Sequence, residues 1–168
     1  LNFLWSGNYG FLADHGVKKR AEVKTGNVAD LNLSLLGALL EAKIAAEPVL
    51  LSTRARGLPI KLYPVLSDFN YVVLRVKINN EFYFLDATSS LHTFGFLPER
   101  CLNGQGRAMG ETSDWIDLKP NAKERTTFDL KLSLNTDGQI SGSASISHSG
   151  YAAYNARQTY FSSSQEEE

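Results

Sequence analysis

The sequence is poor in the residue types that usually form metal sites and disulfides. Its 168 residues contain one cysteine and three histidines. A single cysteine excludes an internal disulfide and a zinc site built from several thiolates. The histidines, His15, His92 and His148, are scattered along the chain and lack the paired spacing on one helix that metal ligands typically show. We therefore expect no metal and no other cofactor.

An excess of positive charge and long apolar runs are also missing. The net charge is -1 and the isoelectric point is about 6.4, so no basic field is available to bind nucleic acid or anionic lipid. The basic run within residues 17–24 is interrupted by Glu22 and contains no aromatic residue, which favours the solvated face of a short helix. No apolar stretch approaches the roughly 20 residues that cross a bilayer. We expect neither nucleic-acid binding nor direct membrane insertion.

The ends of the sequence predict that the chain is part of a longer protein. It begins at Leu1, with neither an initiator methionine nor a basic segment followed by an apolar run. It stops at three consecutive glutamates, Glu166, Glu167 and Glu168. We therefore expect the flanking domains of a full-length protein to be among its partners.

What the sequence does contain is enough apolar material for one core with a small appended module. Apolar residues make up 43% of the chain and aromatic residues 11%, which is sufficient for one well-packed domain. The polar, proline-bearing segment 119–124 is the expected boundary. It separates a first domain, residues 1–119, from the start of a β-rich domain, residues 120–168, which we expect to be incomplete.

The second part alternates in the manner of an antiparallel hairpin. Apolar residues occupy every second position from Phe128 to Leu134, a turn is expected at residues 135–138, and residues 139–149 return as a Ser- and Gly-rich strand. Residues 151–161 are expected to form a short helix. Because a two-stranded hairpin is only marginally stable alone, we expect it to pack on the first domain or to require further strands.

The first part contains a helix whose start is clearly marked at Val28. Asn27 is a favourable N-cap, and Asp30 follows three residues later, where its carboxylate can reach back to the free amides of the first turn. Leucines cover most of the helix circumference as far as about Ala42, which predicts a largely buried central helix. An apolar strand is expected next, over residues 49–53.

A hairpin follows, with strands expected at residues 71–78 and 81–85 and two asparagines in the turn. A two-residue turn places Val73 opposite Asp86. Because side chains alternate between the faces of a strand, Tyr71 and Asp86 then project from the same face as diagonal neighbours. A carboxylate is therefore aimed at the side chain of residue 71.

Beyond this hairpin we expect a structured loop and one last strand at residues 115–118. The glycine-rich segment 103–110 lacks the glycine spacing of dinucleotide-binding and phosphate-binding loops. We predict that this segment is a mobile loop rather than a nucleotide site.

Several of these segments together resemble the core of the transglutaminase-like superfamily of papain-type thiol enzymes. The segments are residues 26–32, 49–54, 69–73 and 85–88, and the resemblance extends roughly from Trp5 to Trp115. It implies a papain-like α+β fold, with a buried helix packed on an antiparallel sheet, and acyl transfer through a thioester. It also implies a bacterial protein, secreted or periplasmic, in which a β-rich domain follows the core.

The resemblance implies a triad that has lost two of its three members. In active members of the family a Cys opens the helix, a His begins a strand and an Asp closes the next strand. Here Val28 and Tyr71 stand at the Cys and His positions, and Asp86 remains. A thiolate nucleophile needs a sulfur and a base. We expect Asp86 to persist because it accepts hydrogen bonds from backbone amides or from the Tyr71 hydroxyl.

The resulting hypothesis is a catalytically degenerate domain that acts as a binding or scaffolding module and holds a peptide or protein segment in a relict cleft. The expected cleft residues are Trp5, Asn27, Asn70 and Tyr71. Two alternatives stay open. One is an active cysteine peptidase or acyl transferase that uses Cys101, which is near His92 in sequence, or residues outside this segment. The other is an architectural spacer with no ligand.

Overall fold

The computed structural model describes residues 3–16, 22–63, 65–120 and 123–163. The chain forms two compact units, Leu1–Asn121 and Ala122–Glu168, which are described separately. Most of the short helix expected within residues 17–24 lies outside the described residues. That the second unit is an incomplete domain stays a prediction.

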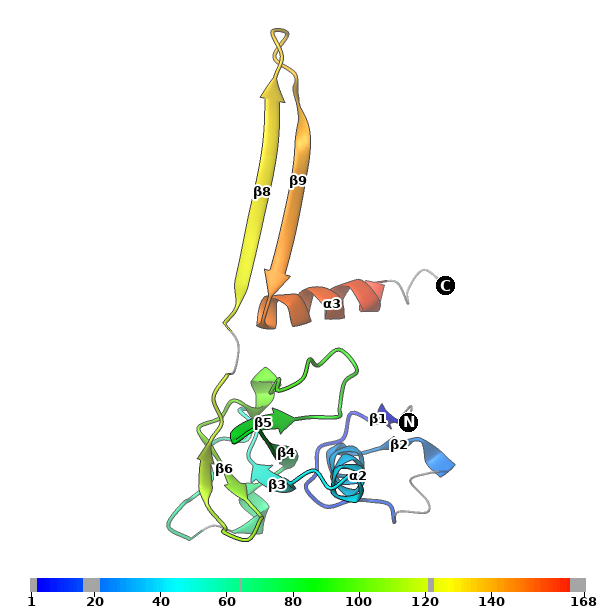
Figure 1. The fold of residues 1–168 in the computed structure, drawn as a ribbon, viewed down its shortest axis with the longest axis vertical. Coiled ribbons are helices and arrows are strands. Elements are labelled where there is room, and N and C mark those ends of the chain that lie inside the picture. The colour runs from blue at the N-terminus through cyan, green and yellow to red at the C-terminus, as the bar shows by residue number, and fades with distance from the viewer. Residues whose placement is uncertain (1–2, 17–21, 64, 121–122, 164–168) are drawn as a thin grey trace. The chain divides into compact units, whose positions relative to one another are not determined.

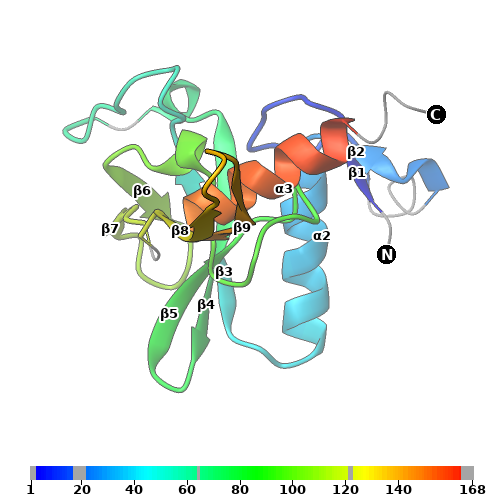
Figure 2. The ribbon, with the colours of Figure 1, turned by 90° about the horizontal axis from the view of Figure 1, so that it is seen from above.

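The first unit is built on a five-stranded antiparallel sheet in the order β5-β4-β3-β6-β7, and its strands are labelled in Figures 1 and 2. In chain order, its strands are β3 (Ala46–Leu51), β4 (Tyr71–Ile78), β5 (Glu81–Leu85), β6 (Gln105–Ala108) and β7 (Trp115–Asp117). Helix α2 (Val28–Glu41) packs against β3 and β4, and Figure 2 shows it alongside the sheet. A helix on an antiparallel sheet is the α+β architecture predicted from the sequence.

Short elements complete this unit. Strands β1 (Leu4–Trp5) and β2 (Thr25–Gly26) form a parallel pair. Two 3₁₀ turns, η1 (Leu66–Asp68) and η2 (Glu99–Cys101), precede β4 and β6. The core lies between the first turns of α2 and the middle of the sheet, and it contains Val28, Ala29, Val49, Leu50, Leu51, Phe69, Tyr71, Val72, Val73, Leu97, Cys101, Ala108 and Leu118.

The start of α2 has the predicted capping box. The Asn27 side chain accepts a hydrogen bond from the Asp30 amide at 2.8 Å. The Asp30 carboxylate in turn accepts one from the Asn27 amide at 3.1 Å. The prediction of a largely buried helix is wrong, because only Val28–Asn32 is buried and Leu40 is 53% exposed. The sheet covers the first turns of α2 and leaves its later leucines partly in solvent.

Asp30 also joins the helix to the preceding chain, because its carboxylate accepts the amide of His15 at 3.2 Å. Burial raises the pKa of Asp30, but the hydrogen bonds from His15 and Asn27 outweigh it and leave that pKa below its usual value. We expect Asp30→Ala to lower the free energy of unfolding by about 1–2 kcal/mol, as cap removal generally does. Denaturant titration at neutral pH checks this.

The pH dependence of the same variant provides a control. Because the folded-state pKa of Asp30 is lowered, its stabilising contribution is complete above the unfolded value of about 3.9 and is lost as the pH falls through the folded value. The difference in unfolding free energy between wild type and Asp30→Ala should therefore shrink in acid. A difference that grows as the pH falls would contradict this role for Asp30.

The β4–β5 hairpin has the predicted register. Leu74 pairs with Leu85, which places Asp86, the residue after β5, opposite Val73. The two turn residues, Asn79 and Asn80, have φ angles of 49° and 66°. Positive φ at both positions matches the right-handed twist of the flanking strands, and asparagine tolerates it better than most residues do.

Strand β3 begins at Ala46, three residues earlier than predicted, and therefore includes Pro48. The carbonyl of Pro48 accepts the amide of Met109 at 2.8 Å, so the side of this residue that lacks an N–H faces the β6 edge. The ladder between β3 and β6 begins only at Val49. Because proline has no N–H, the reciprocal bond to the carbonyl of Met109 cannot form, and the ladder stops at this residue.

The prediction of a mobile loop at residues 103–110 is wrong, because β6 lies within this segment. It pairs with β3 on one side and with β7 on the other. Gly106 allows this close pairing, since a Cβ atom there would lie 2.7 Å from Val49 Cγ1 and 3.0 Å from the carbonyl oxygen of Leu50. The glycine reflects close approach of two strands rather than flexibility.

The second unit contains the predicted hairpin and helix. Strands β8 (Arg125–Leu134) and β9 (Ile140–Ser149) pair along their whole length, from Arg125 opposite Ser149 to Leu134 opposite Ile140. Helix α3 (Tyr151–Ser163) follows β9 directly and contacts it, with Tyr151 and Ala152 buried.

Among the described residues, no helix is long and apolar enough to cross a membrane.

Candidate functional site

The first residue of α2 has a hydrocarbon side chain. Val28 is the first residue of α2 and is completely buried. Its amide donates to the carbonyl of Asn8 at 3.2 Å, so this helix amide is already occupied. One turn further along the helix, the Asn32 side chain donates to the carbonyl of Val72 at 3.0 Å. This contact fixes the first turns of α2 against the start of β4.

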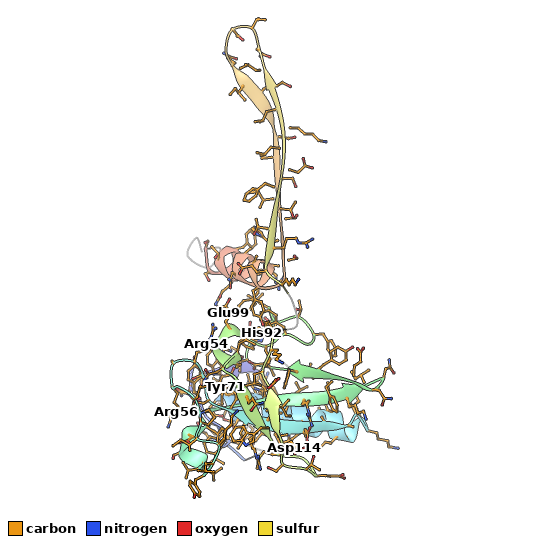
Figure 3. The ribbon with its side chains drawn as sticks, turned by 90° about the vertical axis from the view of Figure 1, so that its left-hand side faces the viewer. Arg54, Arg56, Tyr71, His92, Glu99 and Asp114 are labelled. Carbon is orange, nitrogen blue, oxygen red and sulfur yellow. The ribbon has the colours of Figure 1, made fainter. Side chains whose placement is uncertain are left out.

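Tyr71 and Asp86 meet as the hairpin register predicts. Tyr71, which is labelled in Figure 3, is the first residue of β4. Its side chain has no exposed surface. Its hydroxyl donates to Asp86 Oδ2 at 2.8 Å. Burial, and secondarily the charge of Asp86, raise the pKa of Tyr71 far above its usual value. The phenol is therefore fixed in its protonated form and cannot serve as a base near neutral pH.

Both oxygens of the Asp86 carboxylate accept hydrogen bonds. Its Oδ1 accepts the amide of Thr88 at 3.0 Å and the side-chain amide of Asn32 at 3.2 Å. Its Oδ2 accepts the Tyr71 hydroxyl. The expectation that Asp86 accepts hydrogen bonds from a backbone amide and from Tyr71 is thus confirmed.

Arg100 is one of the residues that the sequence reasoning missed. Its Nη2 and Nε donate to the Tyr71 hydroxyl at 2.8 and 3.2 Å, and Nη2 also donates to Thr88 Oγ1 at 2.7 Å. The same nitrogen lies 3.6 Å from Asp86 Oδ2. Burial lowers the pKa of Arg100, but Tyr71 and Asp86 act more strongly together and raise it. The phenol oxygen therefore bridges a cation and an anion.

Two aromatic rings lie close to the Arg100 guanidinium. Its central carbon lies 4.8 Å from the Trp5 ring centroid and 5.3 Å from that of Tyr71. Tyr9 stacks on Trp5 at 5.8 Å and meets the Tyr71 ring edge-on at 5.6 Å. Cation–π contacts of this kind add to the hydrogen bonds and hold Arg100 in place. The group consisting of Tyr71, Asp86, Thr88 and Arg100 is called the Tyr71 network below.

Cys101 lies at the edge of this network but is not activated by it. It is completely buried in η2. Burial, followed by the charge of Asp86, raises the pKa of the thiol well above its usual value, and the opposing effects of Arg100 and a hydrogen bond with Tyr71 are smaller. A buried, protonated thiol is a poor nucleophile.

His92, the nearest histidine to Cys101 in sequence, lies next to the backbone of the network. Its Nδ1 is 3.2 Å from the carbonyl oxygen of Asp86. Burial lowers the pKa of His92, and this outweighs the effects of Asp86 that raise it. The imidazole is therefore neutral near pH 7 and contributes no charge that would stabilise a thiolate.

The other expected cleft residues use their polar groups within the fold. Trp5 Nε1 donates to the Asn8 carbonyl at 3.0 Å, and Asn27 Nδ2 donates to the Leu12 carbonyl at 2.9 Å. Asn70 accepts the Thr53 amide and donates to the Thr53 hydroxyl, both at 2.9 Å. Ligand binding by these side chains stays a prediction.

Sequence signals for the missed residues differ. Thr88 lies two residues after Asp86 within a segment that carries the family resemblance. Asn32 is a polar residue one helical turn after Val28, a position that faces the sheet, and could have been found from that spacing. Arg100 had no comparable signal, because its role depends on how the chain returns after residue 88.

Within the described ranges, no three His, Cys, Asp or Glu residues are grouped closely enough to hold a metal ion. Comparisons with models of protein families, with curated proteins and with solved structures found no match. The family resemblance inferred from the sequence therefore stays a prediction.

Proposed function

We propose that the first unit is a transglutaminase-like domain that has lost catalysis and serves as a binding or scaffolding module of a larger exported bacterial protein. The observation that carries this proposal is the Tyr71 hydroxyl, which donates to Asp86 and accepts from Arg100. It stands where the family has an imidazole. A phenol held in this way neither accepts a proton nor releases one during turnover.

The chemistry of the three positions supports a non-catalytic role. Acyl transfer needs a nucleophile, a base that takes its proton and a group that orients the base. Val28 supplies no nucleophile, Tyr71 supplies no base, and Asp86 orients a hydroxyl that is also fixed by Arg100. In a protease triad, loss of the nucleophile alone costs about six orders of magnitude in kcat. Binding of a peptide or protein segment, or scaffolding, is the role that remains.

Restoring two of the positions tests the proposal. We will introduce Val28→Cys in a Cys101→Ala background, so that a single thiol is present, and then add Tyr71→His or the matched control Tyr71→Phe. An imidazole beside a thiol stabilises the thiolate, so the pKa of the introduced thiol should be lower by about one unit or more with Tyr71→His than with Tyr71→Phe. Ultraviolet absorbance of the thiolate against pH measures this without requiring access to the buried site.

Equal thiol pKa values in the two variants would contradict the proposal, because positions 28 and 71 would then not share one site. Circular dichroism of each variant establishes that the comparison is made between folded proteins.

A further inference from the structure

One face of the hairpin of the second unit carries four consecutive apolar cross-strand pairs, and a polar pair, Thr126 and His148, follows them on the same face. Cross-strand pairs Phe128–Ile146, Leu130–Ala144, Leu132–Gly142 and Leu134–Ile140 lie on this face. The residues on the other face are Arg125, Thr127, Asp129, Lys131, Ser133, Ser141, Ser143, Ser145, Ser147 and Ser149. The eight residues of the first set are called the apolar hairpin face below.

The apolar hairpin face is open to solvent within the second unit. Its six large side chains are between 55% and 72% exposed, and Figure 3 shows side chains projecting on both sides of β8 and β9. Six such side chains present on the order of 600 Å² of apolar surface, which is the upper end of what monomeric proteins expose. A two-stranded hairpin also needs packing on its apolar face to be stable.

We propose that a second copy of this chain covers the apolar hairpin face, so that two hairpins pack face to face about a two-fold axis. This inference concerns the second unit and does not depend on the proposed function of the first. Two copies would together bury roughly 1,200 Å², which reaches the lower limit of specific, stable interfaces. An isologous contact also needs a surface that complements itself.

The distribution of side-chain size across the face supplies this complementarity. The β8 half carries four large residues in a row, whereas the middle of the β9 half carries Gly142 and Ala144. A two-fold axis parallel to the strands sets β8 of one copy over β9 of the other. Leu130 and Leu132 of each copy then lie over the small residues in the middle of the other copy's β9. This allows the two sheets to approach at normal packing distance.

Charge does not oppose this contact. The charged residues of the two strands, Arg125, Asp129 and Lys131, all lie on the opposite face, and His148 lies at the end of the apolar series, next to the Phe128–Ile146 pair. No ion would therefore be buried at the centre of the contact, and no desolvation penalty of a charge would have to be offset.

Sedimentation equilibrium of the 168-residue chain tests the proposal. At about 100 μM, where an interface of micromolar affinity is mostly occupied, we expect twice the protomer mass of 18.6 kDa. Leu132→Lys places a charge at the centre of the face and should weaken dimerisation at least tenfold. The matched control Ser133→Lys adds the same charge on the polar face and should leave the dissociation constant within about twofold.

A wild-type chain that is monomeric at this concentration would overturn the proposal, whether another part of the chain or a different protein covers the face. A dimer whose affinity is unchanged by Leu132→Lys would also overturn it, because the contact would then lie elsewhere. If Leu132→Lys does not fold by circular dichroism, Leu130→Ser, a milder change on the same face, is used with the same expectation.

Discussion

Replacing Asp86 with alanine is expected to lower the free energy of unfolding of the first unit by about 3–5 kcal/mol, the usual cost of removing one partner from a buried charge pair. The Asp86 side chain has no exposed surface, and its loss leaves Arg100, whose side chain is 24% exposed, without its anion. It also leaves the Tyr71 hydroxyl and the Thr88 amide without their acceptor. Each unsatisfied buried donor adds to the cost.

Urea unfolding followed by tryptophan fluorescence measures this effect in the correct unit, because Trp5 and Trp115, the two tryptophans of the chain, both lie in the first unit. Asp114→Ala removes an exposed carboxylate from the same unit and should change the unfolding free energy by less than about 0.5 kcal/mol. If Asp86→Ala does not fold, Asp86→Asn should still be clearly less stable than Asp114→Ala. Equal stability of the Asp86 and Asp114 variants would mean that the Tyr71 network does not stabilise the fold.

The second large effect is expected in the chemistry of Cys101. A thiol-reactive probe at neutral pH should modify it at least about a thousandfold more slowly in the native chain than in denaturant, because access requires opening of a unit whose stability is several kcal/mol. Complete burial of Cys101 and its raised thiol pKa both slow this modification. The time course of probe modification, followed once in native buffer and once in denaturant, gives both rates.

A matched control is Thr112→Cys in a Cys101→Ala background, since Thr112 lies in an exposed turn between β6 and β7. The introduced thiol should react at nearly the rate seen in denaturant. Rapid modification of Cys101 itself would instead favour the alternative in which this cysteine acts as a relocated nucleophile.

The parts of the fold that follow local rules could be predicted from the sequence. Asn27 and Asp30 form the capping box because its geometry involves only four consecutive residues. The register that aims Asp86 at Tyr71 follows from the length of one turn. The alternation in β8 and the positions of its turn and of α3 are equally local.

The predictions that failed depend on contacts distant in sequence. Gly106 suggests a loop until β3 is known to lie against it. Leu40 has the same character as Leu31, yet it is 53% exposed, whereas Leu31 is buried. Arg100 enters the Tyr71 network 29 residues after Tyr71, and no pattern within either segment indicates that the two side chains meet.

The antiparallel sheet is joined unevenly, and this determines where it separates most easily. β3 pairs with β4 through six residue pairs, from Ala46 opposite Val76 to Leu51 opposite Tyr71, but with β6 through only two. A short ladder holds few hydrogen bonds, so partial opening should release β6 and β7 together while β3, β4 and β5 stay paired. Amide protons of β6 would then exchange with solvent before those of β4, and the peptide bonds just before β6 would become the first sites open to a protease.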